Sequence, residues 1–304
     1  MRILVTGATG VIGRRVVPRL IAAGHLVTAV ARTPHKRAEI AIAGATPIEL
    51  DLFARAAVRR AVAAHDAVIN LATHLPVGLR MLLPGAWRTN NRIRGVASGI
   101  LADAATAGNV QILVQESFAP VYPSRGDEWI DETTPIAPVR YNRTVADAEA
   151  AAERFTRAGR TGIVLRFAMF YGADAWQTRE TIRAVRRGFA PMPGAPDAFV
   201  SSISHDDAAG AVIAALDAPA GIYNVTDDEP MRRSDYYDAL AEILRVPPPR
   251  IPPAWLALAL GSLGSMLTRS LRISNRKLRH QARWIPKYPS MREGWRAVVA
   301  AERG

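Results

Sequence analysis

Three glycines near the start of the chain have the spacing of a backbone loop that holds phosphates. Gly7, Gly10 and Gly13 lie in the run VTGATGVIG of residues 5–13. In such a loop the first glycine permits a tight turn, the second lets the backbone approach a pyrophosphate, and the third lets helix and strand pack closely. Free N–H groups at the start of the following helix then bind the phosphates. The run predicts a dinucleotide site made by Gly7, Ala8, Thr9, Gly10, Val11, Ile12 and Gly13.

The end of the next expected strand indicates which dinucleotide is bound. An acid there would bond the ribose 2′-OH of NAD, whereas an arginine accommodates the 2′-phosphate of NADP. Arg32 ends this strand, a basic run follows at 35–37, and the first acid is Glu39. We therefore predict NADP(H), with NAD(H) as the alternative. The remaining predicted cofactor contacts follow later strands: Asp51, Leu52, Leu71, Ala72 and Thr73.

Strand and helix signals alternate through the first two thirds of the chain. Expected strands cover 3–6, 26–31, 47–50, 67–71, 110–114, 162–167 and 222–225, and expected helices cover 12–23, 93–107 and 144–158. This alternation implies parallel strands joined by right-handed crossovers. We predict an α/β fold, a Rossmann doubly wound parallel sheet of about seven strands with a smaller C-terminal substrate lobe.

Prolines interrupt the alternation after residue 171, in clusters at 191–196 and 247–253. Proline clusters of this kind mark loops rather than strands or helices. We predict a dinucleotide-binding domain of residues 1–171 plus 199–226. The small substrate-binding lobe is predicted to comprise residues 172–198 plus 227–304.

Composition excludes several classes of protein. The chain has 304 residues and no cysteine, so disulfides, thiolate metal sites and a catalytic thiol are excluded, and we expect no metal. It starts without a basic and apolar leader, and its longest apolar run, 254–267, is shorter than the roughly 20 residues of a membrane span. We expect a cytoplasmic protein with no transmembrane segment, as a monomer or homodimer.

The net charge of +12 is concentrated near the C-terminus, where residues 266–296 hold nine arginines or lysines and one acid. A basic stripe can attract an anionic membrane, nucleic acid or a phosphorylated small molecule, or it can be a solvated surface. No nucleic-acid-binding motif accompanies the charge, so we expect no nucleic acid partner. A membrane-surface or partner-binding role for this segment stays open as an alternative function.

Several later segments carry a family resemblance. The glycine run and Asp51-Leu52 are followed in order by LRFAMFYG at 165–172, ISHDDAA at 203–209, GIYNV at 221–225 and WIP at 284–286. In this order they resemble the extended short-chain dehydrogenase/reductase superfamily, in its NAD-dependent epimerase/dehydratase branch. The resemblance implies hydride transfer on a small-molecule substrate, either a nucleotide sugar or another small carbonyl or hydroxyl compound. It also implies a catalytic tyrosine, a lysine four residues later, and an assisting serine or threonine.

Two of those three positions are altered in this chain. Tyr141 matches the tyrosine, but Val145 stands at the lysine position and Phe118 at the expected hydroxyl position. Ser117 is adjacent to the latter and stays a candidate donor. A phenol has an ordinary pKa of about 10, so it needs a nearby cation to act as a base near neutrality.

Three hypotheses follow for this altered site. In the first, Tyr141 acts with positive charge supplied by another cation, such as Arg140 or Arg143, and by the nicotinamide ring itself. In the second, other groups that follow strands do the chemistry, namely Glu116, Ser117, His74 and Tyr122. Across these two hypotheses the candidate catalytic residues are Tyr141, Ser117, Glu116 and His74. In the third, the protein is a non-catalytic NAD(P)-binding sensor or scaffold. We favour an NADP(H)-dependent oxidoreductase or epimerase-like enzyme.

Overall fold

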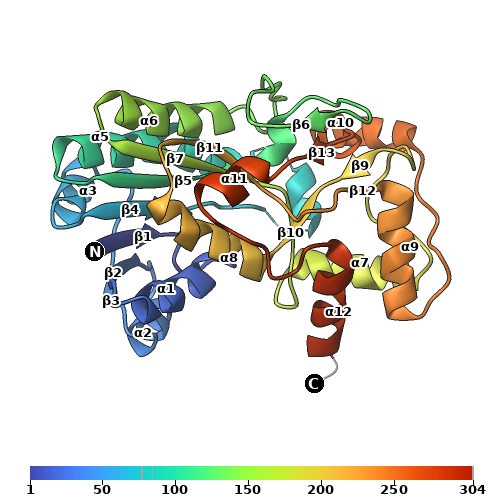
Figure 1. Ribbon diagram of the computed structural model, residues 1–304, viewed down its shortest axis with the longest axis horizontal. Helices are drawn as coiled ribbons and strands as arrows, with labels where there is room; N and C mark the ends of the chain where they lie inside the picture. Colours follow the sequence, from blue (N-terminus) through green and yellow to red (C-terminus); the bar gives the residue numbers. More distant parts are fainter. Residues whose placement is uncertain (77, 84, 303–304) are drawn as a thin grey trace.

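The computed structural model describes residues 1–76, 78–83 and 85–302 (Figure 1). A seven-stranded sheet occupies its centre, with strand order β11-β7-β5-β4-β1-β2-β3. Its strands are β1 (Arg2–Thr6), β2 (Leu26–Val30), β3 (Thr46–Ile48), β4 (Ala67–Asn70), β5 (Ile112–Phe118), β7 (Thr161–Phe167) and β11 (Gly221–Val225). All neighbouring pairs run parallel. The predicted doubly wound α/β fold is confirmed.

Helices cover both faces of this sheet (Figure 1). One layer holds α1 (Gly13–Ala22), α2 (Pro34–Ile42) and α8 (His205–Ala214), which η4 (Ala215–Asp217) follows. The other holds α3 (Arg55–Val62), α5 (Ser98–Ala107) and α6 (Val145–Arg157).

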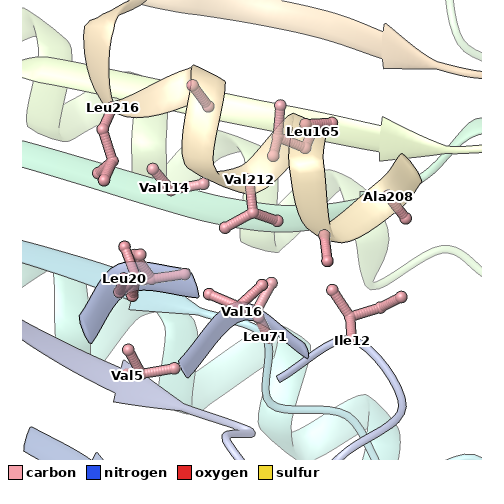
Figure 2. Close-up of a cluster of buried hydrophobic side chains, with 14 of the residues drawn as sticks. Val5, Ile12, Val16, Leu20, Leu71, Val114, Leu165, Ala208, Val212 and Leu216 are labelled. Atoms are coloured by element: carbon pink, nitrogen blue, oxygen red, sulfur yellow. The ribbon is translucent and has the colours of Figure 1, made fainter. Parts of the chain in front are cut away.

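Each strand contributes side chains to the cores on both sides of the sheet, since successive side chains point to opposite faces. Val5 packs with α1 and α8, whereas Leu4 packs with α3, α5 and α6. Figure 2 shows Val16 and Leu20 of α1 opposite Val212 of α8. The glycine loop is therefore anchored on a helix with a fully packed inner face.

The expected helix over 93–107 differs in the structure. It begins earlier, as α4 (Arg88–Arg92), and passes through a π-helical turn, η2 (Ile93–Ala97), before α5. A π turn shifts the phase of every later side chain, and such turns are often found at functional sites. Here the turn carries a buried arginine, Arg94, toward β5.

A smaller lobe lies at the other end of the molecule (Figure 1). It contains the strand pairs β8 (Met169–Tyr171) with β10 (Ser202–Ser204) and β9 (Phe199–Val200) with β12 (Met231–Arg232). Its helices are α7 (Trp176–Arg186), α9 (Arg233–Leu244) and α12 (Met291–Ala301). They share a separate core in which Tyr171 stacks on Trp295, with 5.3 Å between ring centroids.

The remaining elements that the structure describes are one strand pair and five short helices. Strand β6 (Trp129–Ile130) pairs with β13 (Arg272–Ile273), and the short helices are η1 (Gly78–Leu82), η3 (Ala119–Val121), η5 (Ala254–Leu260), α10 (Gly261–Leu267) and α11 (Arg276–Gln281). Leu278 of α11 and Trp284 pack into the core of the large domain. We therefore propose that α11 belongs to the dinucleotide-binding domain, although the sequence predicts it in the small lobe.

The basic C-terminal segment is partly used by the fold. Arg269 donates to three backbone carbonyls of the loop 120–137, and Lys277 donates to a carbonyl of β11. Arg279 pairs with Asp228 at 2.9 Å. Part of the positive charge thus holds this segment against the rest of the chain. Among the described residues, no helix has the length and apolar character needed to cross a membrane.

Candidate active site

Two positions of the glycine loop lie so close to other backbone atoms that only glycine fits there. Gly7 has a φ of +68°, and a Cβ there would lie 2.3 Å from the carbonyl oxygen of Leu71. A Cβ on Gly13 would lie 2.2 Å from the carbonyl oxygen of Gly7. These contacts bring β1, the end of β4 and the start of α1 together. Because the first amides of a helix have no partner within it, the cradle fits the diphosphate of a dinucleotide.

A cavity of about 590 Å³ begins at this loop and extends into the small lobe. The predicted cofactor residues that line it are Gly7, Gly10, Val11, Ile12, Gly13, Leu71 and Thr73. Ala8 is instead buried in the core beneath the loop, and Thr9 and Ala72 do not line the cavity. The cavity therefore starts where the sequence predicts the dinucleotide.

The residues predicted for the adenosine end lie near the edge of the sheet. Arg32 is exposed after β2, and within the described ranges it forms no ion pair. Its neighbour Arg37 is engaged with Glu49 at 2.7 Å. Asp51 is exposed and accepts a hydrogen bond from the backbone of Phe53, while Leu52 packs partly against the core. The guanidinium of Arg32 is thus available to a ligand.

Tyr141 and Glu116 line the same cavity. The Tyr141 ring meets Trp87 edge to face, with 4.3 Å between centroids. Burial raises the pKa of Tyr141 above its ordinary value, and the positive charge of Arg94 opposes that rise in part. Tyr141 is therefore protonated at neutral pH and is suited to donate a proton rather than to accept one.

Arg94 is the charge that acts on Tyr141, whereas Arg140 and Arg143 are exposed. Its Nη2 lies 2.6 Å from Oε1 of Glu116, and the two side chains are only 7% and 12% exposed. Nε of Arg94 and Oε2 of Glu116 have no partner among the described residues. Buried polar atoms are normally hydrogen-bonded, so these two atoms leave the pair incompletely satisfied at the point where Glu116 lines the cavity.

Ser117 lies outside the cavity, which corrects the expected hydroxyl donor. Its hydroxyl donates to Glu149, which is paired with Arg166 on the other face of β5. Because side chains alternate along a strand, Glu116 and Phe118 line the cavity while Ser117 points away from it.

Two other candidates are also placed away from the cavity lining. His74 is exposed, and its backbone N–H donates to Asn90. Tyr122 is buried, and its hydroxyl donates to Asn224 at 2.8 Å. Burial raises the pKa of Tyr122 to about 12. The structure therefore brings Tyr141 and Glu116 together, without Ser117, His74 or Tyr122.

A second charged cluster lines the cavity at Asp174 and His205. Asp174 pairs with Arg14 and, at 2.8 Å, with Arg15. Burial alone would raise the pKa of Asp174, but Arg15 holds it below its ordinary value. Nδ1 of His205 lies 3.1 Å from Asp174, yet burial lowers the pKa of His205 to about 4, so the ring is neutral. Among the described residues, no cluster of acids and histidines has the arrangement of a metal site.

The rest of the cavity is largely apolar and rich in aromatic rings. Its lining side chains include Trp87, Phe118, Phe167, Met169, Phe170, Trp176, Met192, Phe199, Leu263 and Met266. They come from both domains, so the sequence alone does not reveal that they meet. Two further arginines, Arg233 and Arg269, line this part.

Comparisons with known proteins agree with this architecture. The NAD dependent epimerase/dehydratase family matches residues 3–226. A 3-diazoavenalumate denitrifying reductase of a Streptomyces species is 34% identical over 97% of this chain and 99% of its own length. A 2-alkyl-3-oxoalkanoate reductase of Shewanella oneidensis is 26% identical over 85% of this chain and 70% of its own.

Solved structures share the fold. A human epimerase family protein with NADPH superposes with a TM-score of 0.80 at 21% identity, covering 99% of both chains. A UDP-glucose 4-epimerase of Thermotoga maritima with UDP-glucose has a TM-score of 0.78 at 22% identity, covering 100% of this chain and 99% of its own.

Proposed function

The chain belongs to the NAD dependent epimerase/dehydratase family, and on that premise we propose that it is an NADP(H)-dependent reductase of an apolar, aromatic small molecule. One observation carries the proposal: a single cavity joins the glycine loop to Tyr141, Glu116 and a wall of aromatic rings. The reductases named among the relatives favour reduction as the direction.

Cofactor binding is assigned to three sets of residues. The glycine loop holds the diphosphate, and Arg32 holds the 2′-phosphate of the adenosine ribose. Asp51 and Leu52 flank the adenine, and Leu71 and Thr73 line the ribose path. NADPH bound in this way supplies a hydride.

Tyr141 supplies the proton that completes a two-electron reduction. Its phenol is protonated because burial raises its pKa, and it faces the cavity. When the proton leaves, Arg94 stabilises the phenolate, since a guanidinium stays charged at any pH that a protein tolerates. Glu116 holds Arg94 in place through the contact at 2.6 Å. A cation from another helix thus takes the role implied for the missing lysine.

The wall of the cavity favours an aromatic substrate over a nucleotide sugar. A sugar diphosphate needs many donors, because buried phosphates and hydroxyls must be hydrogen-bonded. Aromatic rings such as Trp87, Phe118 and Phe199 offer apolar contact instead.

Fluorescence titration with NADPH and NADH tests the cofactor assignment. Arg32→Ala should weaken NADPH binding about tenfold to a hundredfold, because hydrogen bonds to a charged group contribute about 1.5–3 kcal/mol. NADH binding should stay unchanged, and the exposed control Arg59→Ala should affect neither. Equal losses for both cofactors would overturn the NADP(H) assignment.

Turnover is tested by mixing the protein with deuterated NADPH and a panel of aromatic ketones, enones and diazo compounds. Deuterium should appear in a reduced product, and Tyr141→Phe should abolish its appearance without changing NADPH affinity. Cofactor binding with no transfer to any member of the panel would replace this proposal by the non-catalytic alternative.

A further inference from the structure

Arg233, the first residue of α9, is the most deeply buried cation of the cavity wall. It is 1% exposed and lines the cavity. Its Nε donates to the carbonyl of Ala195 at 3.3 Å and its Nη2 to that of Leu267 at 3.0 Å. Its Nη1 has no partner, and no acid among the described residues lies within ion-pair distance of it.

A buried guanidinium without a counter-ion is costly, because desolvation of the charge is not compensated by an opposite one. Burial lowers the pKa of Arg233, and the phenol of Tyr237 offsets this in part. The group nevertheless stays protonated near neutrality. The fold therefore maintains a fixed positive charge with one unpaired, buried nitrogen in a residue that lines the cavity.

The other charged residues of the cavity wall do not neutralise the charge of Arg233. Both acids of the lining are already engaged, Glu116 with Arg94 and Asp174 with Arg14 and Arg15. Arg269, the other arginine of this region, directs its bonds to backbone carbonyls. The substrate end of the cavity thus carries uncompensated positive charge.

The surroundings of Arg233 leave room for its flat guanidinium. A Cβ on Gly194, whose φ is +151°, would lie 2.8 Å from Cζ of Arg233, so this glycine permits the loop to pass over it. Met192, Phe199 and Leu267 form the nearby cavity wall. An anion attached to an apolar body matches this combination of the Arg233 guanidinium and apolar neighbouring side chains.

We propose that the guanidinium of Arg233 binds a carboxylate of the substrate, so that the substrate is an aromatic or otherwise apolar acid. The inference rests on the proposed reductase function and adds the class of its substrate. A carboxylate on an apolar body places a single charge among the apolar side chains of this wall, whereas a nucleoside diphosphate would place at least one further charge there.

Calorimetric titration of the NADPH-loaded, unmodified protein tests this without any variant. The probes are trans-cinnamate, its methyl ester, its amide and UDP. Cinnamate should bind at least about tenfold more tightly than the ester or the amide, because only the acid offers a charged acceptor. Equal affinity for acid and ester, or tighter binding of UDP, would overturn the assignment.

Variants then locate the effect. Arg233→Met should remove the preference for cinnamate over the ester, and Arg233→Lys should keep part of it. Arg232→Met is the matched control, because this neighbouring arginine pairs with exposed Asp127 and does not line the cavity; it should keep the full preference. An unchanged preference in Arg233→Met would refute the role of Arg233.

The two proposals fail separately in this design. Affinity for NADPH is measured for each protein before the probes are added. If the unmodified protein does not bind NADPH, the reductase proposal fails. If it binds NADPH but does not distinguish cinnamate from its ester, only the carboxylate site is rejected.

Discussion

Two buried arginine–glutamate pairs lie on opposite faces of strand β5 and differ in how completely they are satisfied. Behind the strand, Arg166 donates through Nε and Nη2 to Glu149, and Ser117 donates to the same carboxylate. In front of it, Arg94 makes one contact with Glu116 and leaves Nε and Oε2 free.

The difference distinguishes a structural pair from the pair for which we propose a function. In the pair behind β5, the remaining guanidinium nitrogen of Arg166 donates to Tyr122, whose hydroxyl donates onward to Asn224. A network with each charge paired stabilises one arrangement of the strands. The front pair keeps one unpaired donor and one unpaired acceptor, and its Glu116 lines the cavity. Both pairs are buried, so the feature that distinguishes them is whether all the hydrogen bonds of the buried charges are made.

The largest expected effect is on folding stability, in the pair behind β5. Glu149→Ala should lower the free energy of unfolding by about 3–5 kcal/mol, because it leaves Arg166 buried without a counter-ion. Urea denaturation measures the loss. Glu153→Ala, at an exposed site on the same helix, should change stability by less than about 0.5 kcal/mol. Similar losses for both variants would contradict the structural role of the pair.

The front pair should respond in activity more than in stability. Glu116→Gln should slow NADPH oxidation by about a hundredfold, because Arg94 is no longer held by a carboxylate beside Tyr141. Stability should fall by only about 1–2 kcal/mol, since the amide oxygen of the glutamine can still accept a hydrogen bond from Arg94. Stopped-flow absorbance and denaturation are measured on the same preparation, with Arg94→Lys as the charge-preserving control. An unchanged rate would remove this pair from the proposed machinery.

The Asp174–His205 cluster extends the comparison to pH. Burial lowers the pKa of His205 to about 4 from 6.5, so the unfolded chain binds more protons between these values. Protonation of His205 therefore does not lower the free energy of unfolding above about pH 6.5. As the pH falls toward 4 the free energy of unfolding decreases, by about 2 kcal/mol between pH 7 and 4.5. Denaturation midpoints at several pH values, for the unmodified protein and for His205→Gln, isolate this contribution. The variant should show a shallower pH dependence; identical slopes would mean that other groups are responsible.

The smallest expected effect concerns Ser117. Ser117→Ala should cost about 1 kcal/mol of stability, because Glu149 loses one of its donors, and should leave NADPH oxidation within about twofold. A large loss of rate at unchanged stability would instead restore Ser117 as the hydroxyl donor of the site.

Much of the fold followed from local patterns in the sequence. The alternation of strands and helices predicted the parallel sheet, and the glycine spacing predicted the loop that opens the cavity. Both features depend on residues that are close in the chain, so backbone geometry and side-chain periodicity determine them. Tyr141 was found by its motif, and the structure places it on the cavity wall.

The partners of Tyr141 could not be found in this way. Arg94 precedes Glu116 by 22 residues and reaches it from a π-helical turn, whose altered phase no regular helical pattern describes. Ser117 was considered because it is adjacent in sequence, yet alternation along β5 turns it toward Glu149. A charged residue among apolar neighbours at 93–98 was the one available signal, and it did not identify a partner.

The sequence by itself determined the sheet, the glycine loop and the type of residue at each position of the site. Only the tertiary structure decided which charges are neutralised, because Arg233, Arg94 and Glu116 come from elements whose contacts depend on packing across the whole chain. Local geometry is set by neighbouring residues, whereas the pairing of buried charges is set by which elements the core brings together.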